Sequence, residues 1–134
     1  MAYNFETLDT NILLRFILND IPEQRAKVIK LLSKPDTRYH VADLAISEMS
    51  YVLETQLKHP RILIVREVQQ ILSESNINCN RALFSEVLPF YLSHPKLSFA
   101  DCCLSIYAAL NQAEPLWTFD KKLALQSPTA KELN

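Results

Sequence analysis

The sequence contains no glycine, although glycine makes up about 7% of residues in typical proteins. Phosphate-binding loops and dinucleotide-binding turns need glycine where the backbone approaches the ligand, so the sequence excludes both kinds of site. The absence also leaves asparagine as the residue expected where a helix ends in a left-handed backbone conformation. Asn19 and Asn111 stand at such positions.

Long apolar runs are also missing. No run reaches the roughly 18 residues of a membrane-spanning helix, so no span is predicted. Glu6 and Asp9 interrupt the N-terminus before any apolar region, and no signal peptide is expected. Cysteine is scarce and lacks the spacing of a disulfide framework, since Cys79 stands alone and Cys102 adjoins Cys103. We therefore expect reduced thiols and a cytoplasmic protein.

The remaining composition is that of an ordinary globular protein. The chain has 134 residues, of which 49% are hydrophobic, and this predicts a single domain over residues 1–134. The net charge is −1, so no overall positive field indicates nucleic-acid binding. Any contact with RNA would have to use a local patch or bound metal ions.

Short strands are predicted to alternate with helices. This order is typical of an α/β sandwich around a mostly parallel sheet. Asp20 is expected to cap the second helix and Ser47 the third. The two helices within 61–92 are expected to form a hairpin inserted between sheet elements. The predicted strands cover residues 4–8, 38–42 and 116–119, and the main helices cover 12–18, 21–33, 47–53, 61–73, 81–92 and 99–111.

Acidic residues follow the predicted strands. Asp9 comes after the first strand, Glu48 is expected in the first turn of the helix after the second, and Asp120 follows the last. Because the carboxyl ends of parallel strands share one edge of a sheet, these acids are expected to lie near one another. Asp101 joins them if the 99–111 helix begins at that edge.

Two explanations of these acids remain open. Each acid could simply cap a helix or favour its positive end. Several carboxylates in one crevice would instead repel one another and require a cation, and Mg²⁺ suits oxygen ligands. None of the three histidines adjoins these acids in the sequence, so zinc is not expected.

Four segments resemble a known family in order and spacing: "LDTNILLRFILND", "ISEMSYVLE", "LSFADCCLSIYAAL" and "LWTFDKKLA". Over essentially its whole length the chain resembles the PIN-domain ribonucleases, and most closely the VapC-type toxins of bacterial toxin–antitoxin pairs. The resemblance implies a three-layer α/β/α fold with a short, mostly parallel sheet. It also implies RNA cleavage with Mg²⁺ or Mn²⁺, a homodimer, and a small antitoxin that blocks the metal site.

The resemblance also implies particular roles. Asp9, Glu48, Asp101 and Asp120 match the catalytic, metal-binding acids of the family. Asn11 matches the asparagine that supports the first acid, Thr10 is expected to assist it, and Thr118 matches the hydroxyl residue that orders the site. The family often has a glycine before the last strand, and Asn111 is expected to substitute for it here.

Three basic residues and two apolar segments each have two interpretations. Arg15, Lys121 and Lys122 could contact RNA phosphates or form a solvated face. The apolar segments 12–32 and 46–72 could form an interface or only cover the sheet.

Three alternatives to an RNA-cleaving enzyme remain. Aspartate-nucleophile phosphatases are disfavoured because they would need an acid at Asn11, and an inactive PIN-like interaction module is disfavoured because all four acids are present. DNA remains a possible substrate of a metal-dependent nuclease.

Overall fold

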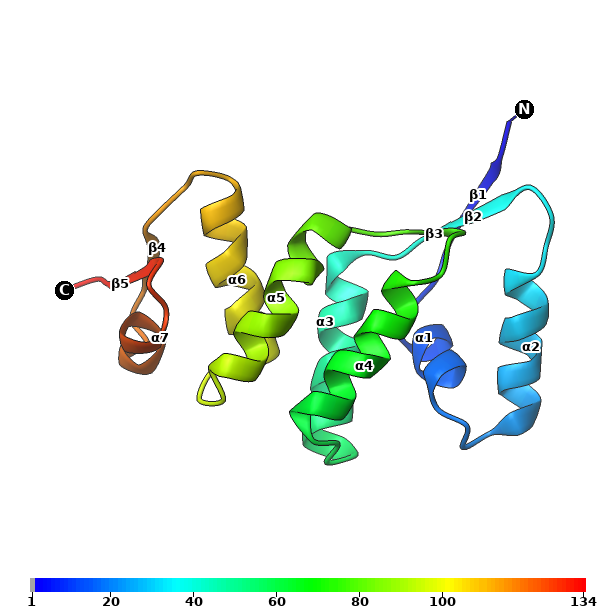
Figure 1. Ribbon diagram of the computed structural model, residues 1–134, viewed down its shortest axis with the longest axis horizontal. Helices are drawn as coiled ribbons and strands as arrows, with labels where there is room; N and C mark the ends of the chain where they lie inside the picture. Colours follow the sequence, from blue (N-terminus) through cyan, green and yellow to red (C-terminus); the bar gives the residue numbers. More distant parts are fainter. Residues whose placement is uncertain (1) are drawn as a thin grey trace. The chain divides into compact units, whose positions relative to one another are not determined.

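The computed structural model describes residues 2–134, and these residues form two compact units (Figure 1). Unit 1 extends to Asn80 and unit 2 covers Arg81–Asn134. Unit 1 contains β1 (Asn4–Thr7), α1 (Thr10–Ile17), α2 (Pro22–Leu32), β2 (Thr37–His40), α3 (Asp43–Tyr51), the π-helical turn η1 (Val52–Gln56), α4 (Arg61–Leu72) and β3 (Ile77–Asn78). Unit 2 contains α5 (Arg81–Ser93), α6 (Phe99–Leu110), β4 (Leu116–Thr118), α7 (Lys121–Gln126) and β5 (Ala130–Glu132).

Unit 1 is built on a parallel three-stranded sheet in the order β1-β2-β3. The register pairs Thr7 with His40, and the Leu8 N–H donates to the His40 carbonyl at 3.0 Å. The chain therefore leaves β1 and β2 at the same edge of the sheet, and α1 and α3 each begin within three residues of it. In Figure 1 helices α1 to α4 lie below these strands.

The core of unit 1 lies between this sheet and its helices. Tyr39 is fully buried on the inner face of β2, where its hydroxyl donates to the Leu31 carbonyl, and burial raises the pKa of its phenol. Ile77 pairs with Tyr39 and is also fully buried. The helices add an apolar layer that includes Leu13, Ile46, Met49, Leu53, Ile64, Val68 and Ile71.

Unit 2 has its own core and a second parallel sheet, β4-β5. Phe99 of α6 stacks on Phe84 of α5 with ring centroids 6.2 Å apart, and it meets the edge of Tyr91 at 5.1 Å. Such aromatic pairs bury large apolar areas in favourable geometries. They join α5 to α6 despite Pro89, which lies exposed inside α5.

Most predicted elements are confirmed by the structure, and the pairing is parallel. The strand over 116–119, however, was expected to share a sheet with the strand over 4–8, and it pairs instead with β5 in a second sheet. The expected helical hairpin over 61–92 is also wrong. The segment between α4 and α5 forms β3, the third strand of the sheet. The Tyr39 N–H donates to the Asn76 carbonyl at 2.8 Å, and the Val41 N–H donates to the Asn78 carbonyl at 2.9 Å. Strand β5 was not predicted, because its sequence Ala-Lys-Glu has little strand propensity.

Two predicted helix caps are also wrong. Helix α2 has Ile21 at its N-cap, without a side-chain hydrogen bond, because both carboxylate oxygens of Asp20 accept from the Arg15 guanidinium at 3.0 Å. Helix α3 already begins at Asp43, an acid suited to the positive helix end, so Ser47 lies inside it. Glu48 consequently belongs to the second turn rather than the first.

The left-handed positions differ from those expected in a chain without glycine. Among residues 2–134 the positive φ angles belong to Asp36 (53°), Lys58 (58°) and Gln112 (53°). Asn111 instead ends α6 at φ −93°, and its side-chain amide donates to the Tyr107 carbonyl at 2.8 Å. The expected use of Asn19 and Asn111 at left-handed positions is therefore wrong. At the end of α6, the Asn111 side chain bonds to a helix carbonyl while Gln112, the next residue, adopts the left-handed conformation.

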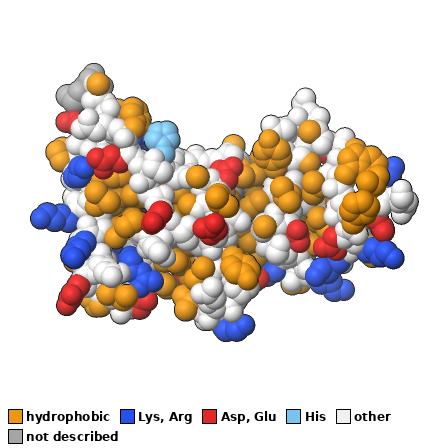
Figure 2. Space-filling view, turned by 180° about the vertical axis from the view of Figure 1, so that it is seen from behind, with side chains coloured by type: hydrophobic (Ala, Val, Ile, Leu, Met, Phe, Trp, Pro, Cys, Tyr) orange, Lys and Arg blue, Asp and Glu red, His pale blue; other side chains and the backbone are white. Residues whose placement is uncertain are grey.

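The outer surface of each unit keeps several large apolar side chains (Figure 2). Within residues 2–134, no helix is both long and apolar enough to cross a membrane. Cys102 is buried, and Cys79 and Cys103 are partly exposed. The assignment of residues 1–134 to one nuclease domain stays a prediction.

Candidate active site

Asp9 occupies the turn between β1 and α1. Its backbone is extended, with φ −91° and ψ 175°, and its Oδ1 accepts from the Ile12 N–H at 3.0 Å, so it is the N-cap of α1. Leu8 before it and Leu13 after it are buried, which fixes the turn from both sides. The side chain itself is exposed, and the cap uses Oδ1, which leaves Oδ2 available to a ligand.

Glu48 reaches the same place from α3. The Thr10 hydroxyl donates to Glu48 Oε2 at 3.0 Å, which joins residues 38 positions apart. Asp9, Thr10 and Glu48 line one cavity of about 530 Å³. The other residues that line it are Asn11, Leu14, Tyr51 and Val52. The structure thus brings together two of the four predicted acids within unit 1.

The polar residues beside Asp9 differ in what they contact. Thr10 was expected to support Asp9 but bonds to Glu48 instead. Asn11 lines the cavity, yet no hydrogen bond to Asp9 is found for it in the described part of the chain. Tyr51 was not predicted. It stands one helical turn after Glu48 with 61% of its surface exposed, and the three-residue spacing on a helix is the signal that could have identified it.

Asp101 lies in the first turn of α6 in unit 2. Ser98 caps this helix, because its hydroxyl accepts from the Asp101 N–H at 3.1 Å. The Asp101 carboxylate is therefore not needed for capping. Asp9 and Asp120 cap helices, and Asp101 lies in a first turn, where an acid favours the positive helix end. Of the four acids, Glu48 is the one that neither caps a helix nor lies in a first turn.

Asp120 follows β4 in unit 2 and caps α7. Its Oδ1 accepts from the Lys122 N–H at 2.9 Å and the Leu123 N–H at 3.2 Å. The Thr118 hydroxyl in turn accepts from the Asp120 N–H at 2.9 Å. Thr118 thus fixes the backbone of Asp120, and Oδ2 again lies outside the cap.

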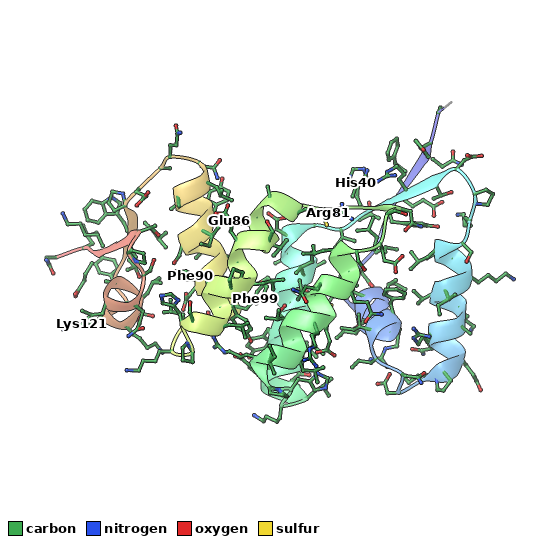
Figure 3. All side chains as sticks on the ribbon, viewed as in Figure 1. His40, Arg81, Glu86, Phe90, Phe99 and Lys121 are labelled. Carbon is green, nitrogen blue, oxygen red and sulfur yellow. The ribbon has the colours of Figure 1, made fainter. Side chains whose placement is uncertain are left out.

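The three candidate cations differ in their surroundings. Arg15 is paired with Asp20, and this pair offsets its charge. Lys121 and Lys122 are exposed at the start of α7, where Figure 3 labels Lys121. The two lysines therefore present their charges to solvent beside Asp120.

A divalent metal ion such as Mg²⁺ needs oxygen ligands from side chains or water. In residues 2–134 no three histidine, cysteine, aspartate or glutamate side chains are gathered closely enough to hold an ion. The cavity of unit 1 does supply two carboxylates, and hard cations such as Mg²⁺ keep several water ligands besides one or two carboxylates. The chemistry of these donors fits such an ion.

The chain was also compared with known proteins. The model of one family, described as PIN domain, matches residues 7–126. Among solved structures, the chain is similar to the crystal structure of PAE2754 from Pyrobaculum aerophilum, with 21% identity and a TM-score of 0.35. That alignment covers 98% of this chain and 85% of the other. A comparison with curated proteins found no match.

The cap at Asp9 predicts a difference between two substitutions. Asp9→Ala removes the oxygen that accepts from Ile12 and should lower the free energy of unfolding by about 0.5–2 kcal/mol. Asp9→Asn keeps an accepting oxygen and should stay within a few tenths of wild type. Urea denaturation measures both. Equal losses in the two variants would contradict the capping role and would make Asp9→Asn unsuitable as a charge-only change.

Proposed function

The chain belongs to the PIN-domain family, and from this premise we propose that it is an endoribonuclease that uses Mg²⁺ or Mn²⁺ to hydrolyse RNA. Proteins of this family are generally metal-dependent nucleases. The observation that carries the proposal is the pair Asp9 and Glu48, which come from distant parts of the sequence and line one cavity. A pair of carboxylates that line one cavity can supply oxygen ligands to a hard cation.

Four acids are proposed as metal ligands. Asp9 and Glu48 belong to unit 1, and Asp101 and Asp120 belong to unit 2. The roles of Asp101 and Asp120 rest on the family pattern, supported by the capping geometry that leaves a carboxylate oxygen available on each. When bound, the ion would lower the pKa of a water molecule and stabilise charge on the phosphate.

The residues around these acids have positioning and binding roles. Thr10 holds Glu48 through its hydroxyl at 3.0 Å, and Thr118 holds the backbone of Asp120 at 2.9 Å. Asn11 is proposed to orient Asp9 or a water ligand. Lys121 and Lys122 are proposed to bind RNA phosphates, since both are exposed at the start of α7. Arg15 is the weakest RNA contact of the three because its charge is already paired.

We further propose that the protein is the toxin of a toxin–antitoxin pair and forms a homodimer. A second cavity of unit 1, about 310 Å³, lies between α1 and α2. Its lining combines the apolar Ile12, Val28 and Leu31 with the basic Arg15 and Lys27 and the uncharged polar Gln24. An amphipathic antitoxin helix with acidic residues beside its apolar face would suit such a groove. Exposed Ile21 and Ile29 on the edge of α2 add apolar surface for a partner.

The nuclease proposal predicts metal-dependent cleavage of RNA. Purified protein with Mg²⁺ or Mn²⁺ should cut RNA to leave 5′-phosphate and 3′-hydroxyl ends, and a chelator should stop the reaction. Asp9→Asn or Asp101→Asn should lower the rate by about a hundredfold or more, because each removes a charge that holds the ion. Gel electrophoresis of an end-labelled RNA measures the rate.

A matched control comes from Asp36, an exposed acid outside the proposed site. Asp36→Asn is a change of the same type at a left-handed position that asparagine tolerates, and it should keep the wild-type rate. Undiminished cleavage by both Asp9→Asn and Asp101→Asn would overturn the nuclease assignment. A loss in Asp36→Asn of the same size would show a non-specific effect of charge.

The toxin proposal predicts an effect on growth. Expression of the wild-type chain alone should slow bacterial growth, and expression of Asp9→Asn should not, because the folded but inactive protein spares cellular RNA. Growth curves after induction measure the effect, and size-exclusion chromatography measures the dimer. A wild type that proves harmless and monomeric would remove the toxin role and leave a free-standing nuclease.

A further inference from the structure

Strand β4 and the bend after it carry two aromatic side chains that the unit 2 core does not use. Side chains alternate between the faces of a strand, so Trp117 lies on the opposite face of β4 from Leu116 and Thr118. Phe119 follows directly after β4, at a bend. Phe119 is 78% exposed and Trp117 is 54% exposed. Figure 2 shows large hydrophobic side chains with Lys or Arg beside them at the end of the view that holds β4 and β5.

Lysine adjoins these rings from the neighbouring strand. The register pairs Trp117 with Lys131, and the Lys131 ammonium lies 5.6 Å from the centre of the Trp117 ring. The Leu133 N–H donates to the Thr118 carbonyl at 2.9 Å, at the end of the sheet where Thr118 pairs with Glu132. Glu132 belongs to the opposite face, where it pairs with Thr118. The exposed face thus combines two aromatic rings with a positive charge and no acid of β5.

We propose that this face, comprising Trp117, Phe119 and Lys131, is a platform on which unpaired bases of the RNA substrate stack. The inference rests on the proposed nuclease function and specifies that the substrate is single-stranded where it is bound. Aromatic rings stack on any base, and a neighbouring lysine neutralises the phosphate backbone. The positive charge of Lys131 beside the Trp117 ring favours a nucleic acid over an uncharged protein surface, because it attracts the phosphate backbone.

The position of the platform along the chain supports this occupant. Phe119 directly precedes Asp120, and Lys121 and Lys122 follow it, so rings, a proposed metal ligand and cations occupy six consecutive positions. Bases bound on these rings would therefore lie next to a proposed metal ligand and two cations.

The sole tryptophan of the chain makes the contact directly measurable. The full chain with Asp9→Asn, in chelator so that no cleavage occurs, is titrated with a 12-nucleotide oligoadenylate while Trp117 emission is recorded. The single strand should quench the emission, and a duplex of the same length should quench it far less because its bases are already stacked. Phe119→Ala should weaken binding by about five- to 150-fold, the range found when a stacking side chain is removed.

Two further variants serve as controls. Phe119→Tyr keeps an aromatic ring and should bind as the parent protein does. Leu125→Ala removes an 85% exposed apolar side chain of α7 that lies off the platform, and it should leave binding unchanged. Quenching that is absent, or that Phe119→Ala does not alter, would overturn the platform. Emission that changes with protein concentration and not with oligoadenylate would also overturn it and would assign the face to self-association.

Cleavage assays separate this inference from the proposed function. In an active background, Phe119→Ala should raise KM more than it lowers kcat, since the ring binds the substrate without holding the ion. Cleavage with unchanged KM and kcat in Phe119→Ala would overturn the platform and leave the nuclease proposal standing. Quenching that depends on Phe119 in a protein without nuclease activity would support the platform as an RNA-binding surface and reject the nuclease.

Discussion

The parallel pairing of β1 with β2 is the constraint on which the site of unit 1 depends. Because both strands run in the same direction, the chain leaves each of them at the same edge, where Thr7 and His40 are paired. Helices α1 and α3 then begin near that edge, and Thr10 can reach Glu48 across 38 residues of sequence. A one-residue change of register would turn Tyr39 out of the core and move His40 into it. The burial of Tyr39 and Ile77 therefore also fixes the position of Asp9.

Capping and function are compatible in this chain because a carboxylate has two oxygens. Asp9 and Asp120 each use Oδ1 for a helix cap, which orients the side chain and leaves Oδ2 for a ligand. Asp101 does not use its carboxylate to cap its helix, because Ser98 caps α6. A metal ligand held by a cap loses little conformational freedom when the ion binds, and such positioning of ligands favours binding.

Much of the fold could be predicted from sequence because periodic apolar residues and strand–helix alternation are local signals. The match to the PIN-domain family confirms the predicted three-layer α/β/α fold class. The wrong predictions concern segments whose structure is decided by contacts with distant parts of the chain. Asp20 would be a good cap, but the Arg15 guanidinium binds it, and the short β3 exists only because β2 supplies its partners. For the same reason the contact of Thr10 with Glu48 depends on the packing of α1 against α3.

The central claim is that Asp9 and Glu48 hold a divalent metal ion in the cavity of unit 1. Mn²⁺ binding, followed by electron paramagnetic resonance of the free ion, tests this claim without RNA or turnover. We expect Asp9→Asn and Glu48→Gln each to weaken binding by about tenfold or more, while Asp36→Asn binds as wild type does. Mn²⁺ binding by Asp9→Asn and Glu48→Gln that is as tight as that of wild type would contradict the claim.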